Sequence, residues 1–86
     1  MILGTLASSA INVQGYYILT PISVGTNPDG VELNLDTSRA YVTNTGSGTV
    51  SVIDTTTNTV IDTISVGNFP DTVELNPDTN RAYVTN

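Results

Sequence analysis

The sequence predicts an all-β protein made of repeated antiparallel strands, and three observations lead to this prediction. Residues 22–44 recur as residues 64–86, with 18 of 23 positions identical at a constant offset of 42. An offset of this size is typical of architectures in which each repeat is one supersecondary unit. Apolar and polar residues alternate with period two in several short segments, and Thr, Val and Ile are plentiful. Both features favour strands over helices.

The composition limits the classes of function. The 86 residues include eight carboxylates and only two basic residues, which gives a net charge of -6. Nucleic-acid binding needs a basic surface, so we expect no nucleic-acid partner. The sequence contains no His and no Cys, which excludes Ser–His or Cys–His catalysis, imidazole or thiolate metal sites and disulfides. No apolar run reaches the roughly 20 residues of a membrane-spanning helix.

Two interpretations of the first 21 residues remain open. Residues 1–10 have the apolar character of a short signal peptide, but they lack a basic start, and their apolar core of about six residues is shorter than usual. The alternative is a degenerate copy of the repeat, because the apolar spacing follows that of residues 46–61 at the same offset. This second interpretation predicts strands over residues 8–12 and 16–24.

The pattern is regular from Ile22 onward. Residues 25–30 form a turn cluster, in which Pro28 restricts φ and Gly30 permits positive φ. Strands are then predicted at 31–35, 40–44, 49–54 and 59–66, and, after a second turn at 67–71, at 72–76 and 82–86. With Thr37 and Ser38 at the tip of the first hairpin, Leu33 would face Val42 and Leu35 would face Ala40.

Four antiparallel strands in about 42 residues have the size of one β-propeller blade. Residues 22–86 resemble the YVTN-family β-propeller repeat. Its tetrapeptide occurs here as Tyr41-Val42-Thr43-Asn44 and again at 83–86. A Val-Gly pair precedes each long turn, a Pro lies within it, and a Val-Ser-Val-Ile-Asp-Thr strand is followed by Thr-Asn-Thr-Val. The resemblance implies a degenerate half-blade at 1–24 (strands c and d), a full four-stranded blade at 25–66 and a half-blade at 67–86 (strands a and b).

The same resemblance implies a class of function. Members of the family resemble surface-layer and other extracytoplasmic proteins, and the wider superfamily includes lactonase-like and haem-d1-type propellers. We therefore expect a non-enzymatic scaffold or interaction module, located extracellularly or at the cell surface, with no cofactor. The alternative is a fragment of a larger lactonase-like enzyme whose catalytic residues lie in missing blades. A closed propeller needs about four blades or more, so the expected partners are other blades. These are either copies of this chain in a ring or the rest of a longer chain.

Acidic residues are the main candidates for a site. In a propeller, loops 25–30, 44–49 and 67–72 would lie on one face around the channel. Asp29 and Asp71 occupy equivalent places there, and a circle of such carboxylates could hold Ca²⁺ through oxygen ligands. The alternative is that each is a turn residue that bonds its own backbone. Glu32 and Glu74 would lie on the innermost strands. They either line a wet channel or pair with a polar neighbour such as Thr43 or Thr85, because an unpaired buried carboxylate is costly.

Other residues are candidates for channel lining, for interaction or for turn structure. The candidates for lining or interaction are Asn27, Asn44 and Phe69. Phe69 replaces Asn27 in the second copy, and its alternative role is packing against Pro70. Arg39 and Arg81 each follow an Asp by three residues, so we expect them to pair with Asp36 and Asp78 across the hairpin turn. Asp54 is expected to organise the turn at 55–58.

Overall fold

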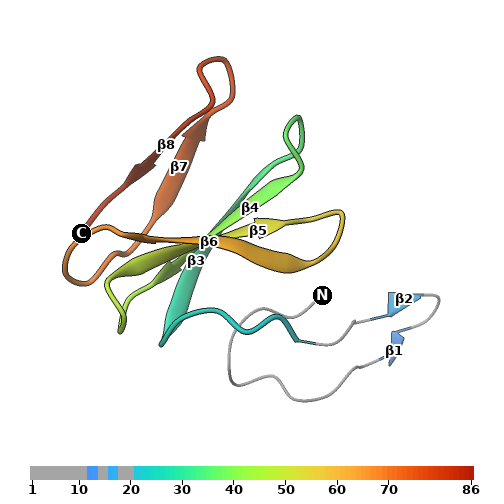
Figure 1. Ribbon diagram of the computed structural model, residues 1–86, viewed down its shortest axis with the longest axis horizontal. Helices are drawn as coiled ribbons and strands as arrows, with labels where there is room; N and C mark the ends of the chain where they lie inside the picture. The colour runs from blue at the N-terminus through green and yellow to red at the C-terminus, as the bar shows by residue number, and fades with distance from the viewer. Residues whose placement is uncertain (1–11, 14–15, 18–20) are drawn as a thin grey trace.

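The computed structural model describes residues 12–13, 16–17 and 21–86, and this part of the chain is entirely β and irregular structure (Figure 1). The strands are β1 (Asn12–Val13), β2 (Tyr16–Tyr17), β3 (Pro28–Asn34), β4 (Arg39–Asn44), β5 (Thr49–Asp54), β6 (Thr59–Ser65), β7 (Val73–Asn76) and β8 (Arg81–Val84). They form three antiparallel sheets, β1-β2, β3-β4-β5-β6 and β7-β8. Among the residues described there is no helix that could cross a bilayer.

The six strands from β3 to β8 lie within three residues of the bounds that the alternation of apolar and polar residues predicts. The turn predicted at 25–30 is shorter than expected, because β3 already begins at Pro28, and its residue with positive φ is Asn27 and not Gly30. The four-stranded sheet is an up-and-down meander of neighbouring strands, here called the first unit, and β7-β8 is the second hairpin.

Near the N-terminus, Asn12 pairs with Tyr17 and Val13 with Tyr16. The strand predicted at 16–24 is not continuous: residues 21–24 lie outside any strand, and only Ile22 makes a single isolated β-bridge. The rest of the strands predicted at 8–12 and 16–24 lies outside the described residues, as does the segment 1–10 with its resemblance to a signal peptide.

All four hairpins from β3 to β8 have loops of four residues, and the last residue of each loop has positive φ. These last residues are Ser38 (φ 54°), Gly48 (φ 67°), Asn58 (φ 56°) and Asn80 (φ 55°). Gly and Asn adopt this left-handed conformation at the lowest steric cost, which explains three of the four choices. Ser38 is the exception, and its counterpart at the offset of 42 is Asn80.

The four-residue loop corrects the predicted register of the first hairpin. Leu33 pairs with Ala40 and Val31 with Val42, whereas a two-residue tip would have paired Leu33 with Val42. The left-handed residue Ser38 lengthens the loop and moves the pairing by two positions. Because side chains alternate with period two, this shift keeps every side chain on the predicted face of the sheet.

Replacing Ser38 with Asn is expected to raise the free energy of unfolding by about 0.5–1 kcal/mol, because Asn tolerates left-handed φ better than Ser. The reciprocal change, Asn80→Ser, should lower it by a similar amount. Urea unfolding of both variants measures the two effects. If both substitutions changed the free energy of unfolding in the same direction, this account of the loops would be contradicted.

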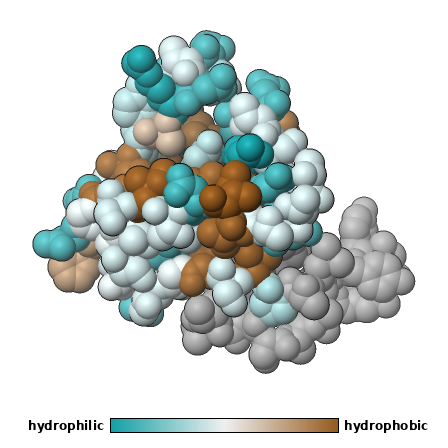
Figure 2. All heavy atoms as spheres, viewed as in Figure 1, coloured by the Kyte–Doolittle hydropathy of each residue, from teal (hydrophilic) through white to brown (hydrophobic). Residues whose placement is uncertain are grey.

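The two faces of the first unit differ in composition. One face, here called the core face, carries Ala40, Val42 and Ile53, which are at most 2 % exposed and pack with Ile22 and Val24. The opposite face is here called the docking face. Its residues are Glu32, Asn34, Tyr41, Thr43, Val50 and Val52, which the strand register places side by side. Figure 2 shows apolar residues gathered across the middle of the molecule, over the four-stranded sheet.

The second hairpin packs on the docking face through β7, which contacts β3 and β4. Val73 of β7 is 4 % exposed, and Pro70 in the preceding loop is fully buried. In Figure 1 this hairpin lies at the upper left of the first unit, and β1 and β2 lie at the lower right of the picture. The packing brings two copies of the repeated sequence into direct contact, and it creates the candidate site.

Candidate functional site

Asn44 is the centre of a buried polar network. Its side chain is 0 % exposed. Its Oδ1 accepts a hydrogen bond from the backbone N–H of Gly25 at 3.1 Å. Its Nδ2 donates to Thr49 Oγ1 at 3.1 Å and to Ser51 Oγ at 2.9 Å. The amide therefore ties the end of β4 to the long turn before β3 and to β5. This places Asn44 inside the sheet module, away from solvent, and gives the last residue of the repeated tetrapeptide a structural task.

The second copy of this asparagine closes the second long turn. Asn86 Nδ2 donates hydrogen bonds to the backbone oxygens of Val66 and Asn68, each at 3.0 Å. The Asn of each tetrapeptide thus holds the loop that enters its own hairpin. Asn86 is exposed, in contrast to Asn44. The two copies therefore share a role but differ in burial.

Thr43 and Thr45 join the first unit to the second hairpin. Thr43 Oγ1 accepts a hydrogen bond from Gly30 N at 2.8 Å and donates one to the backbone oxygen of Asp71, also at 2.8 Å. Thr45 Oγ1 donates to the backbone oxygen of Pro70 at 2.8 Å. Neither threonine was a predicted site residue in its own right. For Thr43 the signal in the sequence was its recurrence as Thr85 in the second tetrapeptide.

Asn27 and Phe69 occupy equivalent positions in the two long turns, and both have φ of 51°. The backbone oxygen of Asn27 accepts a hydrogen bond from Thr45 N at 3.0 Å, which fixes the first turn on the β4-β5 loop. Phe69 is 72 % exposed. A bulky aromatic residue in the left-handed region is strained, and such outliers gather at functional positions. Phe69 is therefore the strongest contact candidate among the loop residues.

The carboxylates of Asp29 and Asp71 are exposed, one in each repeat. Among the described residues neither carboxylate accepts a hydrogen bond, and it is the backbone of Asp71 that bonds to Thr43 and to Thr85. In the same part of the chain, no three His, Cys, Asp or Glu residues come together as a metal-binding group. The two carboxylates thus remain candidates for Ca²⁺ only in an assembly that brings further copies together.

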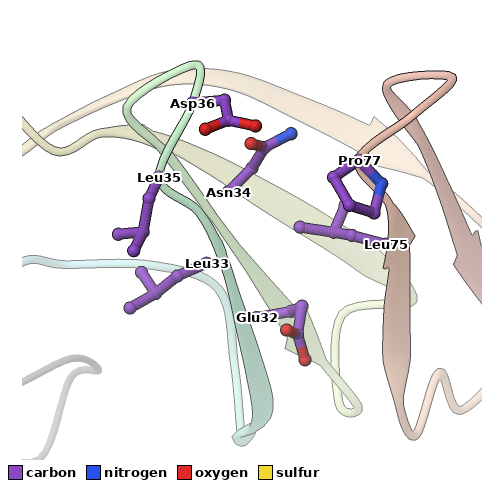
Figure 3. Close-up of a pocket in the computed structure, with 7 residues that line it drawn as sticks. All are labelled: Glu32, Leu33, Asn34, Leu35, Asp36, Leu75 and Pro77. Carbon is purple, nitrogen blue, oxygen red and sulfur yellow. The ribbon is translucent and has the colours of Figure 1, made fainter.

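Glu32 and Asp36 line an open groove of about 260 Å³ between β3 and the second hairpin (Figure 3). The other lining residues are Leu33, Asn34, Leu35, Leu75 and Pro77. Glu32 is half-buried and stands opposite Tyr41 in the sheet, whereas its counterpart Glu74 is exposed. The hydroxyl of Thr43 bonds to Gly30 and Asp71, so Thr43 is not the polar neighbour with which Glu32 was expected to pair. The groove lies at the end of the strands that carries the β3-β4 loop, away from the long turns that the sequence singled out.

Arg39 pairs with Asp54, which corrects the expected pairing with Asp36. The distance from Arg39 Nη1 to Asp54 Oδ2 is 3.9 Å, and the strand register places the two residues directly opposite each other in β4 and β5. Arg39 Nη1 also donates to the backbone oxygens of Thr37 and Ser38. The correction follows from the four-residue loop, which makes Arg39 the first residue of β4. Arg81 is exposed.

Asp54 organises the β5-β6 loop as expected, since its Oδ1 accepts hydrogen bonds from Thr56 N at 2.9 Å and from Thr56 Oγ1 at 2.6 Å. These bonds, with a smaller contribution from Arg39, hold the pKa of Asp54 below its ordinary value of 3.8. A lowered pKa in the folded state adds stability that is present above pH 3.8 and is lost as the pH falls through the folded-state value.

A titration tests this directly. The carboxyl carbon of Asp54, followed by NMR, should titrate below pH 3.8 in the wild-type chain. In Thr56→Val it should titrate closer to that value, because the hydroxyl donor is gone. As the pH falls, the free energy of unfolding of this variant should decrease less steeply than that of the wild-type chain. A wild-type midpoint at or above the ordinary value would contradict the assignment.

Comparison with known proteins adds no identification: no family model matches this chain, and no curated protein sequence matches it.

Proposed function

We propose that this chain is a non-enzymatic β-propeller repeat module, whose blades stack on one another and present a surface for interaction. The observation that carries this proposal is the contact made by Thr43. Its hydroxyl bridges Gly30 of the first unit and Asp71 of the second hairpin, with both distances at 2.8 Å. The four-stranded meander is then one blade, and β7-β8 is the inner half of the next.

The burial pattern supports stacking. Thr43 is 0 % exposed, and Val50 and Val52 beside it on the docking face are buried. Val73 from the second hairpin is buried as well. Burying a Val side chain contributes roughly 1.5–3 kcal/mol, so a few such residues account for a stable contact between neighbouring blades. Close packing face to face is the way in which propeller blades stabilise one another.

The use of the polar side chains supports a structural rather than a chemical role. In the described part of the chain, every fully buried side-chain nitrogen or oxygen has a hydrogen-bond partner. Asn44, Thr43 and Thr45 bond within and between the repeats. Chemistry at an active site needs polar groups held ready for a substrate, and these residues are occupied by the fold. Phe69, exposed and strained, is the feature best suited to contact a partner.

Hydrogen exchange tests the stacking. Thr43→Val removes the bridge and leaves Gly30 N without its partner, so the amides of β7 and β8 should exchange faster. Thr63→Val is the matched control, because Thr63 lies on the edge strand β6, on the opposite face and exposed. It should leave exchange in β7 and β8 unchanged. Unchanged exchange in these strands for Thr43→Val would overturn the proposed stacking.

An activity assay separates this module from a lactonase-like enzyme. The purified chain should hydrolyse a panel of lactones no faster than buffer does. Turnover above that rate that falls in Glu32→Gln would overturn the non-enzymatic assignment, since Glu32 is the half-buried carboxylate of the groove.

A further inference from the structure

The two copies of the repeat differ in what covers the same two apolar side chains. Val73 and Leu75 of β7 are buried and half-buried where β7 packs on the first unit. Their counterparts at the offset of 42 are Val31 and Leu33 of β3, and each of these is 51 % exposed. The chemistry is identical, so the difference lies in the neighbour. The second copy has a docking face to rest on, whereas the first copy shows the same side chains to solvent.

These exposed residues form a continuous surface on one side of β3. Leu35 extends it and is 83 % exposed. Figure 3 shows the side chains of Leu33 and Leu35 pointing away from β7, on the opposite side of β3 from those of Glu32 and Asn34, although both residues also border the groove. We call Val31, Leu33 and Leu35 the open β3 face. Ile22 and Val24 cover the core face over β4 and β5, and this cover stops short of the open β3 face.

The second hairpin carries the matching surface. Glu74, Asn76, Tyr83 and Thr85 are the counterparts of Glu32, Asn34, Tyr41 and Thr43 on the docking face. In the first unit Asn34 is 5 % exposed and Thr43 is 0 % exposed, because β7 lies over them. In the second hairpin all four counterparts are exposed, with Tyr83 at 57 %. Within the described residues, one apolar surface is thus without a docking face, and one docking face is without an apolar surface.

We propose that a second copy of this chain docks on the open β3 face, with the outer side of its β7-β8 hairpin covering Val31 and Leu33. This proposal rests on the proposed stacking of blades, and it names the partner of that same surface. The contact repeats between two copies the packing that already exists within one. Such a contact is head-to-tail, so it leaves one open surface at each end and can continue to further copies.

One substitution between the repeats sets the strength of this contact. Gly30 lets the next unit approach closely, because a Cβ there would lie 3.0 Å from the backbone oxygen of Asp71 and 3.1 Å from Thr43 Oγ1. Thr72 stands at the equivalent place in the second hairpin, with its hydroxyl 2.8 Å from that of Thr85. The side chain of Thr72 lies at the contact with a docked copy, so the two copies are held farther apart than the first unit and the second hairpin of one chain. The contact between copies is therefore weaker than the internal one. The net charge of -6 on each copy opposes association as well, so added salt should strengthen it.

Sedimentation velocity over a range of protein concentrations tests the proposal. The wild-type chain should show concentration-dependent association that strengthens with salt. Leu33→Glu should weaken it by about tenfold or more, because a carboxylate would be buried at the centre of the contact. Ile61→Glu is the matched control, since Ile61 is 49 % exposed on the opposite edge strand β6; it should associate like the wild-type chain. Thr72→Gly, which restores the pattern of Gly30, should associate more tightly.

The outcomes separate this proposal from the proposed function. A wild-type chain that stays monomeric at all concentrations overturns docking between copies and leaves a neighbouring unit of a longer chain as the occupant of the open β3 face. Equal association of Leu33→Glu and Ile61→Glu overturns the assigned surface. In either case the hydrogen-exchange response of Thr43→Val still reports separately on stacking within one chain.

Discussion

Replacing Asn44 with Ala is expected to lower the free energy of unfolding by about 2–4 kcal/mol. The change removes three hydrogen bonds from a side chain that is 0 % exposed. It leaves the N–H of Gly25 without its partner and opens a cavity between β4 and β5. For a chain of this length the total stability is about 4–13 kcal/mol, so the loss is a large share of it. Urea unfolding followed by circular dichroism measures the effect.

The repeat provides the control for this prediction. Asn86 is the same residue at the same place in the second copy, but it is exposed, and its partners are two backbone oxygens near the surface. Asn86→Ala should therefore cost about 1 kcal/mol or less, because water can replace its hydrogen bonds. Equal losses in the two variants would show that the burial of Asn44 does not matter for stability.

Replacing Ile53 with Ala is expected to cost about 2–5 kcal/mol, the range for truncating a large buried aliphatic residue. Ile53 is 0 % exposed and lies at the centre of the core face, packed with Ala40, Val42 and Ile22. The loss combines the transfer of the removed methyl groups with the cavity that they leave. Thermal and urea unfolding of the variant give the value.

Ile61 is the matched position for this second prediction. It is 49 % exposed on β6, the edge strand of the same sheet. Ile61→Ala should cost about 0.5 kcal/mol, as is usual for substitutions at the surface. A loss at Ile61 as large as that at Ile53 would mean that the core of the first unit is not centred on its core face.

The sequence located the secondary structure well because the relevant signals are local. Period-two alternation, together with Gly, Asn and Pro in the turns, predicted β5 with the bounds that the structure shows and the other strands of the first unit within a few residues. It predicted that Asp54 organises its own loop, since that contact spans two residues. The constant offset of 42 residues also indicated that the second hairpin copies the first part of the four-stranded sheet.

The candidate site was less predictable, because it depends on contacts between segments far apart in the chain. Arg39 bonds across the sheet to Asp54 rather than to Asp36, since one left-handed residue, Ser38, sets the hairpin register. Thr43 reaches the backbone of Asp71, 28 residues away, and no local pattern indicates such a bond. The groove of Glu32, Asp36 and Leu75 exists only because two hairpins meet there.

Local chemistry along the chain therefore decided that strands form, where they turn and that the unit is copied, because φ/ψ preferences and side-chain alternation act within a few residues. The tertiary structure alone decided which copy of an identical side chain is buried. Val31 and Val73 occupy equivalent positions in the repeat, but one is 51 % exposed and the other 4 %. Burial depends on what packs against a strand from elsewhere in the fold, and a repeated sequence cannot distinguish its own copies.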